Sequence, residues 1–402
     1  MNTAVMNQRN VVSEGVSRRS IPFLRAALIA FLVFAAYYIG SKIGHTLRFP
    51  DTSLSVIWPP SAVLFAALLL SPARLWPGLL LVTLPAHIAV HAHARIDTWM
   101  ILWFYLFNCA LSLLSALAVR RFVDARLNFS DLKHTITYLI VGVVACPAIV
   151  SLVSAAVKVY GKSDANIWDY WRVSYLSNAL AYLTIAPAIV TGYTGGADFF
   201  RSVTRQRILE AVILAVSFLV ACGLVFGGQI SESIALAALL FAPLPFLLWA
   251  AIRFGPGGCS FALLTLTLIS CWSEVNGHFL FNESSQSKTV LSVQMFLIAI
   301  STSVLLLAAL TEERHQSAQR LRKNETQYRA IVEDQTELIC RFRPDGTLTF
   351  VNSAYCNFSA SIVTSWLAII FWISFPKTIA SRLENISTRS VLNNRCLGWS
   401  IR

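Results

Sequence analysis

Long apolar runs fill this chain from Ile21 to Leu310, and short polar loops separate them. Each run is about 20 residues long, the length of helix that crosses the roughly 30 Å hydrocarbon core of a bilayer. Because lipid offers no hydrogen-bond partner to a backbone amide, each run must pair its own amides and is predicted to be helical. The runs do not alternate between apolar and polar residues, which argues against a transmembrane β-barrel. The sequence predicts an all-α polytopic membrane helix bundle.

The composition supports a membrane protein. Hydrophobic residues make up 56% of the chain and charged residues only 13%, whereas a soluble protein carries about 25% charged residues. We attribute the net charge of +12 to membrane topology and predict no nucleic-acid partner. The eight cysteines form no CxxC pair and most lie in apolar runs, so we predict no disulfide framework, no metal site and no cofactor.

Eight to ten transmembrane helices are predicted, and our preferred count is ten. The second and third runs are separated only by a turn at Ser71–Leu75, and one re-entrant hairpin is the alternative for this pair. The first run is too long for a signal peptide and further spans follow it. The ten expected helices cover residues 21–40, 54–70, 75–92, 98–119, 136–157, 168–192, 207–226, 234–252, 257–274 and 289–311.

Basic residues alternate in density between successive loops. The richer loops hold Arg9, Arg18, Arg19, Arg25, Arg74, Arg120, Arg121, Arg126, Lys133, Arg201, Arg205, Arg207 and Arg253. The poorer loops hold Lys42, Arg48, Arg95, Lys158, Lys162 and Lys288. Because short cytoplasmic loops carry an excess of Lys and Arg, we predict a multi-pass protein of the bacterial inner membrane with both termini cytoplasmic.

Polar side chains within the spans are the candidate ligand-binding residues, since burial of such groups in a membrane is costly and often functional. They are Trp58, His87, His91, Trp171, Arg172, Asn178 and Glu274, with His93 and His278 nearby. His87 and His91 are four residues apart and share a helix face, a spacing that can hold a metal or haem. We prefer the alternative that both rings bond to carbonyl groups near the membrane interface.

The chemistry changes after Leu310, where a polar, strongly charged stretch begins at Thr311. Apolar residues spaced by about seven fit a coiled-coil seam and predict a homodimer through residues 311–331; the alternative is a solvated helix without a partner. The seam is formed by Leu307, Leu310, Leu321, Tyr328, Ile331 and Leu338. Two alternating segments, 338–343 and 347–351, flank Pro344-Asp345-Gly346 and predict a β-hairpin.

The hairpin segment resembles the opening of a Per-Arnt-Sim (PAS) sensory domain over Tyr328–Tyr355, on the motif YRAIVEDQTELI, the turn at Asp345-Gly346 and the strand end at Val351-Asn352. A PAS domain needs on the order of 100 residues, and the sequence departs from the pattern after about Asn357. We expect a short α+β PAS-like stub, followed by a tail that is out of frame or belongs to a gene remnant.

The apolar region resembles the first type of membrane-associated sensor domain, which occurs at the N-terminus of bacterial histidine kinases and diguanylate cyclases. The resemblance is carried by Trp58-Pro59-Pro60, by Trp76-Pro77-Gly78 after Arg74, by Asn178 through Pro187, by Pro245–Gly258 with Arg253-Phe254-Gly255, and by Glu274–Gly277. It implies signal input, a dimeric receptor with a cytoplasmic output, and about eight spans.

We therefore expect five segments: an N-terminal tail (1–20), a membrane sensor domain (21–311), a signalling helix (312–331), a partial PAS domain (332–358) and a non-matching tail (359–402). No phosphate-binding loop, kinase box or cyclase signature occurs, so we predict no enzyme activity and no output domain in this chain. The predicted function is the input portion of a two-component or cyclic-di-GMP receptor for an unknown small ligand or membrane stimulus. The alternative is a small-molecule or ion transporter.

Overall fold

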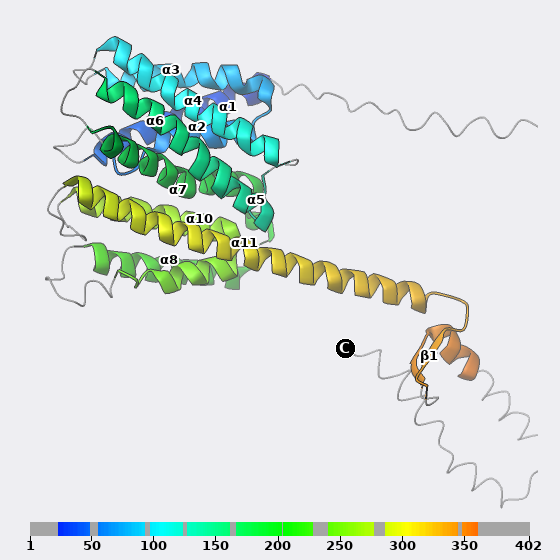
Figure 1. The fold of residues 1–402 in the computed structure, drawn as a ribbon. Helices are drawn as coiled ribbons and strands as arrows, with labels where there is room; N and C mark the ends of the chain where they lie inside the picture. Colours follow the sequence, from blue (N-terminus) through cyan, green and yellow to red (C-terminus); the bar gives the residue numbers. More distant parts are fainter. Residues whose placement is uncertain are drawn as a thin grey trace, which may run out of the picture. The chain divides into compact units, whose positions relative to one another are not determined.

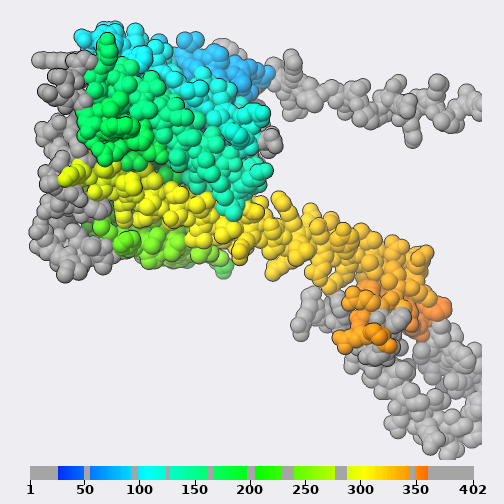
Figure 2. Space-filling model, in the orientation of Figure 1, coloured from blue at the N-terminus to red at the C-terminus, as the bar shows by residue number. Residues whose placement is uncertain are grey.

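The computed structural model describes residues 23–48, 55–92, 97–123, 127–160, 166–202, 204–227, 240–276, 286–344 and 348–360. The chain forms two compact units, Met1–Glu313 and Arg314–Arg402. Figure 1 shows the helices of the first unit lying side by side as a bundle, and Figure 2 shows the outer surface of the same face.

Helices make up nearly all of the described structure. They are α1 (Phe23–Thr46), α2 (Pro59–Leu70), α3 (Trp76–His91), α4 (Thr98–Phe122), α5 (Leu132–Thr137), α6 (Cys146–Val159), α7 (Ile167–Ser202), α8 (Arg205–Phe226), α10 (Leu244–Val275) and α11 (Gln286–Glu333). A short 3₁₀ turn at Ala73–Leu75 precedes α3, and a π-helical stretch, Tyr138–Ala145, joins α5 to α6.

Eight helices among the described residues are long and apolar enough to cross a membrane, with α5 to α6 counted as one and α10 counted once. This confirms the predicted all-α polytopic membrane bundle. Of the ten helices in the preferred count, α2 is shorter than predicted, and the predicted spans 234–252 and 257–274 fall on α10 and on residues outside the described structure.

The second predicted span, residues 54–70, is shorter as a helix than the sequence predicts. Helix α2 has 12 residues, about 18 Å at 1.5 Å per residue, which is too short to cross the hydrocarbon core. Every residue from Pro59 to Leu68 is buried, and α2 packs against α1, α4 and α7. The segment before it, Ser55–Trp58, is not helical. Such backbone is tolerated at membrane depth only where protein surrounds it, and α2 is surrounded on three sides.

One arginine, Arg120, binds the C-terminal end of α2. Nη2 of Arg120, on α4, donates hydrogen bonds to the carbonyl oxygens of Leu68, Leu69 and Ser71 at 2.7, 2.8 and 2.6 Å. Its guanidinium carbon also lies 4.8 Å from the ring centroid of Trp76. These carbonyls have no partner within the helix and carry its negative dipole end, so a cation is the favoured neighbour.

Helix α10 reverses direction at Gly255, the only described glycine with positive φ. Before the break, α10 runs from Phe246, whose ring centroid lies 6.5 Å from that of Phe218 in the middle of α8, to Arg253, which bonds to Glu210 near the start of α8. After it, Ser273 donates to the Phe226 carbonyl at the end of α8, 2.7 Å away. The residue has φ 61° and ψ −159°, a conformation essentially confined to glycine. The predicted spans 234–252 and 257–274 thus correspond in part to two arms of α10; residues 228–239 lie outside the described residues.

The second unit contains a small antiparallel sheet. Strand β1 (Cys340–Phe342) pairs with β2 (Leu348–Val351), as the predicted hairpin requires. Asn352 is buried at its base: its Nδ2 donates to the Glu337 carbonyl at 2.8 Å, and its Oδ1 accepts from the Ile339 amide at 3.0 Å. Asp345 and Gly346 of the predicted turn, and the tail beyond 360, lie outside the described residues.

Candidate functional site

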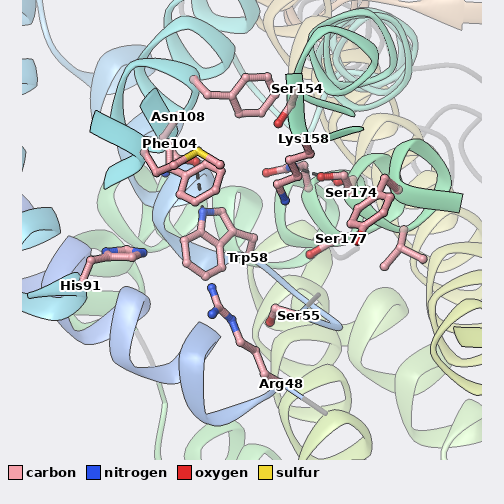
Figure 3. Close-up of a pocket in the computed structure, with 15 residues that line it drawn as sticks. Arg48, Ser55, Trp58, His91, Phe104, Asn108, Ser154, Lys158, Ser174 and Ser177 are labelled. Carbon is pink, nitrogen blue, oxygen red and sulfur yellow. Dashed lines mark hydrogen bonds between the residues drawn. The ribbon is translucent and has the colours of Figure 1, made fainter. Parts of the chain in front are cut away.

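A cavity of about 330 Å³ lies inside the bundle at the end opposite Arg120 and Arg253. Residues of α3, α4, α6 and α7 line it, together with the segment on either side of the α1–α2 loop. Figure 3 shows the labelled side chains converging on the cavity. Volumes of about 300–1,000 Å³ are typical of small-molecule sites.

Trp58 occupies the centre of this cavity. Its indole Nε1 donates a hydrogen bond to Oδ1 of Asn108, 3.0 Å away on α4, and its backbone amide donates to the Ser177 carbonyl at 3.5 Å. The two prolines after Trp58 fix the start of α2, because proline at the first helical positions needs no amide partner. The Trp58-Pro59-Pro60 motif therefore places an aromatic ring where the short helix begins.

Asn178 is part of the cavity wall and bonds to α2. Its Oδ1 accepts a hydrogen bond from the Ser61 hydroxyl at 2.7 Å, and its Nδ2 donates to the Ser174 carbonyl at 2.9 Å. The Ser112 hydroxyl in turn donates to the Ser61 carbonyl at 2.9 Å. These bonds join α2, α4 and α7, so they fix the position of the half-length helix.

Three histidines form a ladder beside the cavity. Nδ1 of His91 lies 2.9 Å from the His87 carbonyl, and Nε2 of His87 lies 3.2 Å from the Ile101 carbonyl, so both nitrogens donate. The Tyr37 hydroxyl then donates to Nδ1 of His87 at 3.1 Å, and Nε2 of His45 donates to Nε2 of His91 at 3.2 Å.

This arrangement suits neutral rings in one tautomer each. Both ring nitrogens of His87 are engaged, so His87 and His91 do not present a shared pair of ligand atoms. No group of three or more metal-ligating side chains occurs in the part of the chain that the structure describes.

Two cations border the cavity. The Arg48 guanidinium lies 5.5 Å from the Trp58 ring centroid, and Nζ of Lys158 lies 5.3 Å from that of Phe104. Nε of Arg48 is buried without a hydrogen-bond partner in the described structure. Burial lowers the pKa of the Arg48 guanidinium, because removal from water disfavours its charged form.

Comparison with known families identifies the bundle. The MASE1 family profile matches residues 29–315. This chain belongs to the MASE1 family. These are membrane sensor domains of bacterial histidine kinases and cyclases, and the chain is accordingly an integral membrane protein with multiple spans and a signalling input domain.

One curated relative resembles a short part of the chain. It is the two-component sensor PprA of Pseudomonas aeruginosa, 43% identical over 53 residues. The match covers 13% of this chain and 5% of the relative's length. No solved structure matches the chain.

The MASE1 bundle brings only some of the predicted ligand-binding residues together. Trp58, His91 and Asn178 line the cavity, and His87 stacks behind His91 with ring centroids 4.1 Å apart. Their role in ligand binding stays a prediction.

Three other predicted residues do not line the cavity. Trp171 donates from Nε1 to the Ala148 carbonyl at 2.9 Å. Arg172 is half-exposed and pairs with Asp169. Glu274 is buried near the end of α10. His93 and His278 lie outside the described residues.

The predicted motif residues hold the MASE1 helices at the opposite end of the bundle. Trp76 is buried and donates from Nε1 to the Leu68 carbonyl at 3.0 Å, while Pro77 and Gly78 continue the first turn of α3. Arg253 binds Glu210 through two bonds of 2.6 and 2.7 Å, next to the Phe254-Gly255 break. These residues fix where α3 begins and where α10 turns.

Sequence reasoning did not assign several residues to the cavity, chiefly Arg48, Asn108, Lys158 and Ser174, nor did it single out His45, which bonds to His91 beside the cavity. Arg48 and Lys158 belong to the predicted basic-poor loops, where cations are few, and this scarcity was a usable signal. The contact between His45 and His91 depends on how α1 packs against α3, which no local pattern reports.

Proposed function

We propose that this chain is the input part of a two-component or cyclic-di-GMP receptor, in which the state of the Trp58 cavity is transmitted along α11. Family membership and the partial similarity to a two-component sensor support signalling input. The residues that would sense are those around Trp58, and the PAS-like hairpin would receive the change.

One contact carries this proposal. Nε2 of Gln294, on α11, donates to the Val56 carbonyl at 2.8 Å, two residues before Trp58, and lies 3.5 Å from the Val173 carbonyl on α7. Gln294 is fully buried, and α11 continues without a break from Gln286 to Glu333. A shift of the Ser55–Trp58 segment would therefore act directly on the helix that leads to the hairpin.

A dimer through residues 311–331 is part of the proposal. Leu321, Tyr328 and Ile331 are 70%, 70% and 57% exposed within a single chain. Seam residues of this kind become buried when a second helix packs against them. The half-polar seam also favours two registers of similar stability, which is useful in a switch.

Insertions near Gln316 test the transmission. In a receptor that joins this chain's residues 1–331 to a kinase or cyclase, two inserted residues rotate the helix downstream by about 200°, and we expect a changed basal output and a lost response. Insertion of seven residues is the matched control, since one heptad restores the phase of the seam. Equal outputs from both variants and the parent would contradict the proposal.

The transporter alternative draws support from one observation: α2 is a half-length helix preceded by non-helical backbone at membrane depth, as in many transporters. Uptake of small solutes by the purified protein in liposomes distinguishes the two functions. We expect no uptake above that of protein-free liposomes.

A further inference from the structure

We propose that the Trp58 cavity binds a small organic anion, a carboxylate attached to a flat apolar group. This inference rests on the proposed sensing role of the same cavity and adds the class of ligand. It stands on the charge, the shape and the aromatic lining of the site.

The charged groups among the described residues that line the cavity are both cations. Arg48 and Lys158 border it from opposite sides, and both point toward the space beside Trp58 in Figure 3. Among the described residues that line the cavity, none is acidic. The buried Nε of Arg48 has no hydrogen-bond partner within the described structure, which is unfavourable for a charged group, so an anion is the ligand that this site stabilises most.

Arg48 is the better anchor of the two cations. Its Nε has no partner within the described structure although the atom is buried. A guanidinium presents parallel N–H groups that match the two oxygens of a carboxylate. The guanidinium carbon of Arg48 lies 5.5 Å from the centroid of the neighbouring Trp58 ring, so this ring covers one face of the guanidinium.

The helix α2 adds to this preference. Its C-terminal carbonyls are already neutralised by Arg120, whereas its N-terminal end begins at Trp58 beside the cavity. The N-terminal end of a helix carries a partial positive charge, which favours an anion nearby. Pro59 and Pro60 remove two amide donors there, so the helix contributes its field and the side chains supply the hydrogen bonds.

Part of the remaining lining is apolar and aromatic, beside serine and asparagine side chains. Met100, Phe104 and Phe107 of α4 and Tyr170 of α7 face the same space as Trp58. Flat rings favour stacked or edge-on contacts with other rings. The cavity volume of about 330 Å³ limits the ligand to a small molecule.

Binding of simple aromatic acids to the purified full chain tests the inference. The probes are benzoate, phenylacetate and indole-3-acetate, with benzamide and benzylammonium as the neutral and cationic counterparts. Titration calorimetry in nanodiscs should show saturable binding of at least one acid, and weaker binding of both counterparts. If none of the acids binds, or if benzamide binds as tightly as benzoate, the inference is wrong.

Variants locate the binding. Arg48→Gln should weaken the acid by about tenfold or more, because a charge-assisted pair is lost, and Lys158→Gln should weaken it less. Arg172→Gln is the matched control, since Arg172 is half-exposed, pairs with Asp169 and does not line the cavity. If Arg48→Gln does not fold, the affinity of Lys158→Gln for the acid is compared with that of Arg172→Gln. Equal affinities in both overturn the assignment to this cavity.

The assay measures binding without any output domain. If the acids bind but the insertions near Gln316 leave the output unchanged, transmission along α11 is refuted and the ligand class stands. If the insertions change the output but no acid binds, the ligand class is refuted and transmission along α11 stands.

Discussion

Helices α7 and α8 follow one another in the chain yet meet different surroundings. In the most apolar stretch of α7, 78% of the residues are buried, whereas in that of α8 only 22% are buried. The more apolar of the two is α8, which shows that hydropathy does not predict burial within a membrane bundle. Lipid accepts apolar side chains as readily as a protein core does, so the buried helix is the one whose small and polar residues need protein partners.

The comparison explains why the cavity lies where it does. Helix α7 contributes Ser174, Ser177 and Asn178 to the cavity wall, and Asn178 bonds to α2. Helix α8 contributes no residue to the cavity lining. The polar groups that distinguish α7 are thus the groups that build the candidate site.

The largest expected effect is a core truncation in α7. Leu183 is fully buried, and Leu183→Ala should lower the free energy of unfolding by about 2–5 kcal/mol, because it leaves a cavity. Unfolding in detergent, followed by circular dichroism, measures the change. A loss similar to that of the α8 variant Leu219→Ala would break the comparison.

A smaller effect is expected at the turn of α10, which packs against both α7 and α8. Gly255→Ala should cost about 1–3 kcal/mol, because alanine is strained at this backbone conformation. A Cβ there would also lie 3.1 Å from Oε2 of Glu312. Gly196→Ala is the control, since its Cβ would meet nothing within 4 Å. Equal melting temperatures for both variants would argue that α10 does not reverse direction at Gly255.

The bond between α2 and α7 should contribute less. Loss of one hydrogen bond within a membrane bundle costs about 0.6 kcal/mol on average, with about 1.7 as the largest value, and we expect Asn178→Ala to fall in this range. A double-mutant cycle with Ser61→Ala isolates the 2.7 Å contact. Strictly additive losses would show that this bond does not couple α2 to α7.

The smallest effect is expected on the lipid-facing side of α8. Leu219 is 49% exposed, and Leu219→Ala should change the free energy of unfolding by no more than about 0.5 kcal/mol. The same detergent series measures it. A large loss would mean that another protein surface covers this side of α8.

The sequence predicts the bundle well because apolar length decides which segments cross lipid. It overestimates the length of α2, because a 12-residue apolar helix inside protein and the end of a 20-residue span look alike in composition. The cavity is predicted only in part: Trp58 and Asn178 are polar groups at unusual depth, whereas the roles of His45 and Arg48 depend on how α1 packs. Trp171 and Arg172 carry the same chemistry but lie on faces of α7 that do not line the cavity, which the helical period alone did not resolve.

The membrane sidedness of two positions tests most directly the proposed transmission, in which the end of the bundle that holds the cavity faces outside and α11 leads into the cytoplasm. Tyr160, at the end of α6, is 90% exposed, and Gln319 is an exposed residue of α11. In a cysteine-free background, Tyr160→Cys should react with an impermeant maleimide on intact cells, and Gln319→Cys only after the cells are opened. Labelling of Gln319→Cys on intact cells would contradict the account.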